Sequence, residues 1–207
     1  MRRFLALLLL LTCAQSHATE TPTVLVFGDS LSTGYGIDVD QSWATLLQAR
    51  LADQGYEHQV VNASISGDTT ESGAARIAQA ITSFEPSLVI LELGANDGLR
   101  GIPLDRMREN LQKIITTSRD SGAAVVLLGI RLPPNYGQRY IEDFDNVFRE
   151  LASELDIPWI EFFMEGVALD DELLQSDGMH PNAAGQPILL ENAWPIIDAA
   201  LVNLRIH

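Results

Sequence analysis

Residues 23–32 read TVLVFGDSLS and decide the fold of this chain. A short apolar run rich in β-branched residues predicts a buried strand, and the glycine-framed turn after it ends that strand. The turn delivers Ser30 to the carboxyl edge of the sheet, which is where open α/β sheets place their ligands. A serine at that edge can act as a nucleophile if a base reaches it.

Downstream of this first strand, the apolar patterns alternate between strand and helix spacing. Further strands are expected at residues 59–61, 88–93, 124–128 and 157–160, and helices near 43–51, 74–81, 107–115, 144–151 and 183–204. Pro187 and Pro195 are expected to cap or kink the last helix. Five strands that alternate with helices predict α/β architecture, a three-layer α/β/α sandwich with a five-stranded parallel sheet. The non-periodic stretches that follow the strands, including 28–41, 94–104 and 163–182, should meet along one edge.

The N-terminus predicts a secretory signal over residues 1–18, which leaves residues 19–207 as one domain. Arg2 and Arg3 precede an apolar run, and small residues stand at 16–18. The run is too short to span a bilayer, which needs about 20 residues, so stable membrane insertion is not expected. The predicted signal indicates a protein that is periplasmic or secreted after the signal has been cleaved. The only cysteine, Cys13, leaves with the signal, and the Thr before it disfavours a lipid anchor.

The net negative charge of the chain argues against polyanionic partners. The chain has 13 Lys and Arg against 28 Asp and Glu, a net charge of −15, and loss of Arg2 and Arg3 makes it −17. Such a surface repels nucleic acid and anionic headgroups. We expect a monomer that acts on a small-molecule substrate.

The supply of a catalytic base is the tightest constraint on a serine hydrolase here. The four histidines are His17, His58, His180 and His207. His17 leaves with the signal, His207 is the last residue, and His58 is expected to be a solvated residue in a polar turn. Only His180 follows a strand and has an acid nearby, Asp177, which could fix the imidazole tautomer. One usable histidine among scattered carboxylates lacks the ligand spacing of a metal site.

Two further segments offer hydrogen-bond donors for an oxyanion. Gly67, within residues 62–68, permits a positive φ and a close backbone approach. Asn96, within residues 94–98, carries a side-chain amide that suits an oxyanion hole. For either segment taken alone, an ordinary glycine or asparagine turn is the favoured interpretation.

Together these motifs resemble the four ordered blocks of the SGNH (GDSL) hydrolases. The blocks are Gly28-Asp29-Ser30-Leu31, Gly67 in Ser-Ile-Ser-Gly-Asp, Gly94-x-Asn96-Asp97 and Asp177-x-x-His180-Pro181. Residues 62–68, 96–101 and 130–137 resemble the exported bacterial thioesterase I/lysophospholipase/arylesterase subgroup more closely still. Ala95 departs from the pattern, because close relatives often carry glycine there. Ser32 stands where the α/β-hydrolase nucleophile elbow needs its last glycine, which disfavours that other fold.

The resemblance implies that Ser30 is the nucleophile, His180 the base and Asp177 its orienter. It implies an oxyanion hole made by the backbone N–H groups of Ser30 and Gly67 with the Asn96 amide. It requires no metal and no organic cofactor. The implied substrates are short to medium acyl esters, aryl esters, lysophospholipids and acyl thioesters.

An acyl groove and two rival functions remain open at this point. The groove could be lined by loop residues Leu99, Ile102, Leu132, Pro134 and Tyr136, although loop packing against the sheet edge explains each of them equally well. A cell-wall polysaccharide deacetylase could use the same triad. A flavodoxin-like binding protein could cradle phosphate in the loop at 28–36, but that loop has no lysine and does not fit Gly-x-Gly-x-x-Gly.

Overall fold

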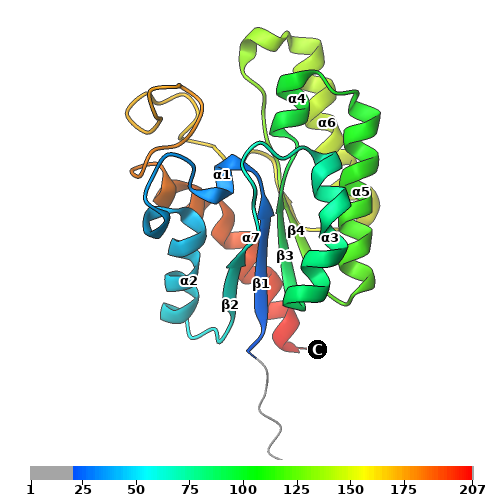
Figure 1. Ribbon diagram of the computed structural model, residues 1–207, viewed down its shortest axis with the longest axis vertical. Coiled ribbons are helices and arrows are strands. Elements are labelled where there is room, and N and C mark those ends of the chain that lie inside the picture. The colour runs from blue at the N-terminus through cyan, green and yellow to red at the C-terminus, as the bar shows by residue number, and fades with distance from the viewer. Residues whose placement is uncertain (1–20, 207) are drawn as a thin grey trace, which may run out of the picture.

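A five-stranded parallel sheet forms the centre of the protein, as the computed structural model of residues 21–206 shows (Figure 1). The strands are β1 (Thr23–Gly28), β2 (Gln59–Asn62), β3 (Pro86–Glu92), β4 (Ala124–Leu128) and β5 (Trp159–Ile160). Their order across the sheet is β2-β1-β3-β4-β5, and every neighbouring pair is parallel. The predicted α/β fold with its parallel sheet is confirmed.

Helices cover both faces of this sheet. The helices α2 (Trp43–Asp53) and α7 (Gln186–Ile206) pack together on one face. The helices α3 (Thr70–Phe84), α5 (Leu104–Asp120) and α6 (Gln138–Leu155) form the layer on the other face (Figure 1). Because both faces are covered, the middle of each central strand is apolar: residues 24–27 of β1 and 88–91 of β3 have no solvent-exposed surface.

Short helices occupy two of the segments in which the sequence shows no periodicity. They are α1 (Ser30–Thr33), directly after β1, and α4 (Ala95–Arg100), directly after β3. The 3-10 turn η1 (Val39–Gln41) lies farther along the same loop as α1, and η2 (Pro134–Tyr136) lies in the loop after β4. Helices of four and six residues are too short to display a helical period. The last helix begins at Gln186, so Pro187 lies in its first turn, where proline is tolerated, while Pro195 lies inside it.

The prediction that His58 is solvated is wrong. Its side chain is buried, and its ring centroid lies 6.0 Å from that of Tyr56. The Nδ1 atom of His58 has no hydrogen-bond partner within the described part of the chain. Burial lowers the pKa of His58, which favours a neutral imidazole packed beside Tyr56.

The two ends of the described chain lie at the edge opposite to α1 and α4. β1 starts at this lower edge in Figure 1, and α7 ends there. No helix in residues 21–206 is both long and apolar enough to cross a membrane. The predicted signal at 1–18, including Cys13 and His17, lies outside the described residues, as does His207.

Candidate active site

Ser30 is the first residue of α1 and stands at the carboxyl end of β1. The Asp29 side chain caps this helix by accepting a hydrogen bond from the Leu31 N–H at 3.1 Å. Gly28 allows the turn to pass close to β3, because a Cβ atom at this position would lie 2.6 Å from Glu92 Oε2 and 2.8 Å from its carbonyl oxygen. Glycine is therefore required directly before the Asp-Ser pair.

His180 connects Ser30 to Asp177. Its Nε2 atom lies 2.9 Å from Ser30 Oγ, and its Nδ1 atom lies 2.7 Å from Asp177 Oδ2. The hydrogen-bond network assigns the proton of the neutral ring to Nδ1, which donates to the carboxylate and leaves Nε2 free to accept from the serine hydroxyl. The structure thus places the three residues in the order that activates a serine.

The Asp177 carboxylate is strongly held as an anion. The N–H groups of His180 and Met179 donate to its Oδ1 atom at 3.0 and 2.9 Å. These bonds, with the one from the His180 ring, lower the pKa of Asp177 to about 2. The carboxylate consequently remains charged while the imidazole changes its protonation state.

The loop that carries Asp177 and His180 is tied back on itself. Leu174 and Pro181 form an isolated antiparallel bridge, and the Gln175 N–H donates to the His180 carbonyl at 2.8 Å. The Gln175 side chain also donates to the Tyr35 carbonyl at 2.7 Å, and the Tyr35 ring lies 4.7 Å from the imidazole. Sequence reasoning missed Tyr35 and Gln175, since neither belongs to a motif.

The three predicted oxyanion donors follow three neighbouring strands of the sheet, β1, β2 and β3. Ser30 begins α1, so its N–H has no acceptor within that helix. Gly67 has φ +84°, in the left-handed region that favours glycine. Asn96 Nδ2 donates one hydrogen to Asp29 Oδ2 at 3.0 Å and has a second hydrogen available. Arg100, which sequence reasoning also missed, donates to the Gly67 carbonyl at 3.0 Å.

Arg76 links the nucleophile strand to the loop that carries Gly67. Its guanidinium donates to Asp68 Oδ2 at 2.7 Å and to the Ala63 carbonyl at 2.6 Å, and it lies 3.8 Å from the centroid of the Phe27 ring. The side chain of Arg76 therefore holds the loop after β2 against the end of β1. As an arginine on a helix surface, it carried no signal in the sequence.

Two buried carboxyl groups lie beneath the site. Glu92 Oε2 accepts hydrogen bonds from the Ser32 hydroxyl at 2.7 Å and from the Asp29 N–H at 3.3 Å. Burial, followed by the nearby Asp29 charge, raises the pKa of Glu92 well above its usual range. Burial also raises the pKa of Asp29, to about 6, against the lowering effect of the bonds from Leu31 and Asn96. A charged residue at the end of an apolar strand was the available signal for Glu92.

A cavity of about 880 Å³ opens beside Ser30 and His180. Its other lining residues are Leu31, Ala95, Asn96, Leu99, Ile130, Arg131, Leu132, Pro133, Pro134, Ile141, Phe162, Met164, Glu165, Gly166, Ala168, Leu169, Asp170, Gly178 and Met179. Most of the side chains are apolar, so the cavity suits a hydrocarbon chain.

Three of the five predicted groove residues, Leu99, Leu132 and Pro134, line this cavity, and two do not. Tyr136 uses its hydroxyl to donate to the Leu99 carbonyl at 3.1 Å, so it packs the η2 turn onto α4. The Ile102 N–H bonds to the Asp97 carbonyl and closes the end of α4. Within residues 21–206, no three His, Cys, Asp or Glu side chains gather as metal ligands.

Residues 26–188 match the GDSL-like Lipase/Acylhydrolase family. The chain belongs to this family. It is 48% identical over 197 residues to Esterase TesA from Pseudomonas aeruginosa, covering 95% of this chain and 96% of TesA. It is 43% identical to an arylesterase from Vibrio mimicus, covering 89% and 92% of the two chains. It is 41% identical to thioesterase 1/protease 1/lysophospholipase L1 from Escherichia coli K12, covering 84% and 83%.

Solved structures of GDSL-like acylhydrolases have the same fold. The crystal structure of TesA superposes with a TM-score of 0.85 at 49% identity, covering 86% of this chain and 99% of TesA. The esterase EstA from Pseudoalteromonas sp., solved in a form inhibited by monoethylphosphonate, superposes with a TM-score of 0.82 at 36% identity, covering 86% and 98%. The predicted family and the predicted acyl-ester hydrolase activity are confirmed by these relatives.

Proposed function

We propose that this GDSL-like acylhydrolase cleaves short- to medium-chain acyl esters, aryl esters, lysophospholipids and acyl thioesters, with Ser30 as its nucleophile. The observation that carries the proposal is the hydrogen-bonded series from Ser30 Oγ through the His180 ring to the Asp177 carboxylate, at 2.9 and 2.7 Å. The names of the relatives from P. aeruginosa, V. mimicus and E. coli support the same range of substrates.

The first half-reaction transfers the acyl group to the enzyme. Ser30 Oγ attacks the acyl carbonyl carbon while His180 Nε2 takes the hydroxyl proton, and Asp177 stabilises the imidazolium that forms. The N–H groups of Ser30 and Gly67, with the Asn96 amide, hold the oxyanion of the tetrahedral intermediate. When this intermediate collapses, the bond to the alcohol or thiol breaks, and the leaving group receives its proton from His180.

The second half-reaction repeats these steps with water. His180 takes a proton from a water molecule, whose oxygen attacks the acyl-enzyme carbonyl, and the same three donors hold the second oxyanion. Collapse of this intermediate returns the proton to Ser30 Oγ and releases the carboxylic acid. No other reactant is needed, because water supplies both the hydroxyl of the acid and the proton of the leaving group.

The cavity and the charge of the protein narrow the choice of substrate. The apolar cavity beside Ser30 offers room for an acyl chain longer than acetyl. The mature net charge of −17 disfavours polyphosphate carriers such as coenzyme A. We therefore expect lysophospholipids and simple esters to be the biological substrates, and acyl-CoA cleavage to be an activity seen in vitro. The signal predicted at residues 1–18 supports export to the periplasm or medium, and we propose that the enzyme acts there as a monomer.

The experiment that tests this function compares p-nitrophenyl esters from acetyl to palmitoyl in the wild type and in Ser30→Ala. We expect activity that peaks at medium chain lengths and disappears in Ser30→Ala. Ser66→Ala is the matched control, because it removes an exposed hydroxyl of the neighbouring loop, and the one bond of that hydroxyl within residues 21–206 is to the Thr33 hydroxyl at 2.8 Å. Acetyl-only activity would favour the polysaccharide deacetylase. Activity that survives in Ser30→Ala would overturn the proposal.

A further inference from the structure

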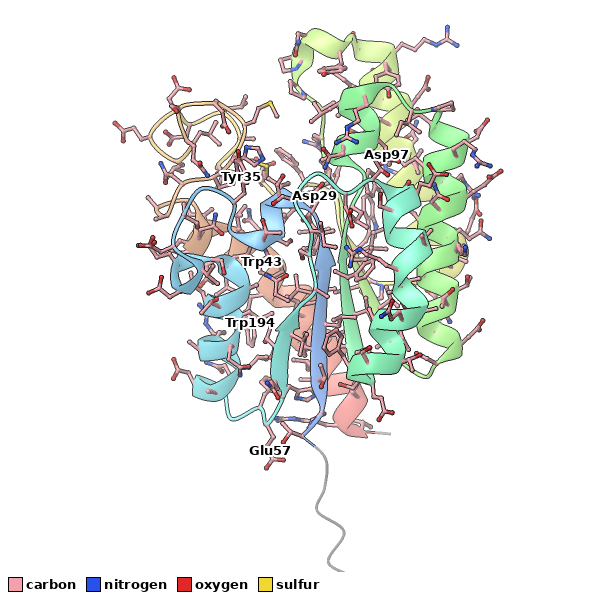
Figure 2. All side chains as sticks on the ribbon, viewed as in Figure 1. Asp29, Tyr35, Trp43, Glu57, Asp97 and Trp194 are labelled. Atoms are coloured by element: carbon pink, nitrogen blue, oxygen red, sulfur yellow. The ribbon has the colours of Figure 1, made fainter. Side chains whose placement is uncertain are left out.

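The Asp29 side chain joins the nucleophile helix to the oxyanion amide. It is fully buried, and its Oδ1 atom accepts from the Leu31 N–H at 3.1 Å in α1. Its Oδ2 atom accepts from Asn96 Nδ2 at 3.0 Å in α4. Figure 2 shows Asp29 at the upper end of β1, where the strand meets α1. None of the steps of acyl transfer uses this carboxylate.

The contact with Asp29 selects one of the two orientations of the Asn96 amide. An amide has a donating nitrogen and an accepting oxygen, and a rotation of its terminal torsion exchanges them. Asp29 Oδ2 accepts from the nitrogen side, while Arg100 Nη2 donates to Asn96 Oδ1 at 3.4 Å on the oxygen side. Both ends of the amide are therefore engaged, and the second Nδ2 hydrogen is left to donate to an oxyanion.

Only a carboxylate serves both contacts of Asp29, because each of its two oxygens must accept a hydrogen bond. Glu92 lies behind it on β3 and accepts from the Asp29 N–H at 3.3 Å. Burial raises the pKa of Glu92 well above its usual range, and that of Asp29 to about 6. Both Asp29 oxygens accept hydrogen bonds, whereas Glu92 Oε1 has no partner among the described residues, so the geometry assigns the negative charge of the pair to Asp29. The other charged or titratable groups around Asp29 are Asp68, whose charge Arg76 balances, and His180.

We propose that Asp29 is a positioning residue that holds the Asn96 amide with its nitrogen directed toward the oxyanion. This inference rests on the proposed function, since it needs Asn96 to be a donor in the transition state. It assigns to the Asp of the Gly-Asp-Ser turn a role distinct from that of the neighbouring nucleophile. Because the amide acts after the substrate has bound, loss of the Asp29 contact should lower kcat and leave KM nearly unchanged.

Asp29→Asn tests the proposal with almost no change in volume. An Asn side chain can accept at one position only, so it must lose either the cap on Leu31 or the bond from Asn96. We expect kcat to fall by about 10²-fold with KM within about 3-fold of the wild type, as for a small displacement of a catalytic group. Asp198→Asn is the matched control, because it alters a 2.6 Å bond to the Tyr56 hydroxyl far from the site.

A double-mutant cycle with Asn96→Ala separates positioning from a loss of folding. If Asp29 acts through Asn96, the double variant should have a kcat within about 3-fold of that of Asn96→Ala alone. The proposal would be overturned if the kcat losses of the two single variants multiplied in the double variant. It would also be overturned if Asp29→Asn kept the wild-type kcat, or if Asp198→Asn lost as much kcat as Asp29→Asn. Failure of the proposed function would appear separately, as activity retained by Ser30→Ala.

Discussion

The Nε2 atom of His180 lies 2.9 Å from the Oγ atom of Ser30, although 150 residues separate them in sequence. The parallel sheet makes this contact possible, because it brings the carboxyl ends of all its strands to one edge. Ser30 follows β1, and His180 lies in the long loop after β5, on the other side of β3 and β4.

Replacement of Asn96 by alanine should lower kcat by about 10²–10³-fold with the fold intact, which is the usual loss for one oxyanion donor. Its side chain bonds to Asp29 and lies near Arg100, so its removal leaves the backbone of α4 in place. Steady-state kinetics and a thermal melt of the same sample make the comparison. A folded Asn96→Ala protein with full activity would remove Asn96 from the oxyanion hole.

Asp177→Asn should lower kcat by about 10³–10⁴-fold, because an amide can stabilise the wrong imidazole tautomer. In the wild type, the pKa of Asp177 is lowered to about 2, so its stabilising bonds are complete above the ordinary value near 3.8 and disappear as the pH falls through 2. The pH profile of kcat/KM between 4.5 and 9 should therefore contain no titration of Asp177. Substantial activity in Asp177→Asn would contradict the triad.

Glu92→Gln should make unfolding less sensitive to pH. The raised pKa of Glu92 means that the folded state retains a proton that the unfolded state releases above about 4.5. Wild-type stability should consequently decrease, relative to that of the variant, as the pH rises above 4.5. Urea unfolding at several values between pH 4 and 8 measures this difference. A difference that grows in the opposite direction would show that Glu92 is charged in the folded protein.

Gly28→Ala should destabilise the protein by about 1–3 kcal/mol, as overpacking does, and should also reduce activity. The new Cβ atom would approach the Glu92 carbonyl oxygen at 2.8 Å, and backbone cannot move aside as a side chain can. Gly55→Ala is a useful comparison, since it meets open space at φ +73° and lies far from the site. Equal activity losses in the two variants, measured alongside urea unfolding, would argue against a specific role for Gly28.

The sequence predicted the sheet and the motif residues because both depend on local patterns. Apolar runs such as 88–93 indicate strands that are covered on both faces. Short spacings such as Asp177-x-x-His180 keep both residues within a single turn. What it could not predict depends on contacts between distant loops. Nothing local distinguishes Arg76 or Tyr35 from other surface residues. His58 is buried beside Tyr56, whose ring in turn lies against Trp194 of α7.

The groove residues illustrate the same limit. Leu132 and Tyr136 lie four positions apart in one apolar loop, yet only Leu132 lines the cavity. The η2 turn rotates Tyr136 toward α4, where its hydroxyl finds the Leu99 carbonyl. The orientation of a side chain in such a loop is decided by the backbone of the turn, which hydrophobicity alone does not reveal.

The position of the two chain ends has a practical consequence. β1 begins and α7 finishes at the edge of the sheet farthest from Ser30 (Figure 1). A resin, an electrode or a fused carrier protein coupled at the start of β1 or the end of α7 would therefore face the side of the molecule opposite to Ser30. Immobilised in this way, the enzyme should present its reactive cleft to the bulk solution.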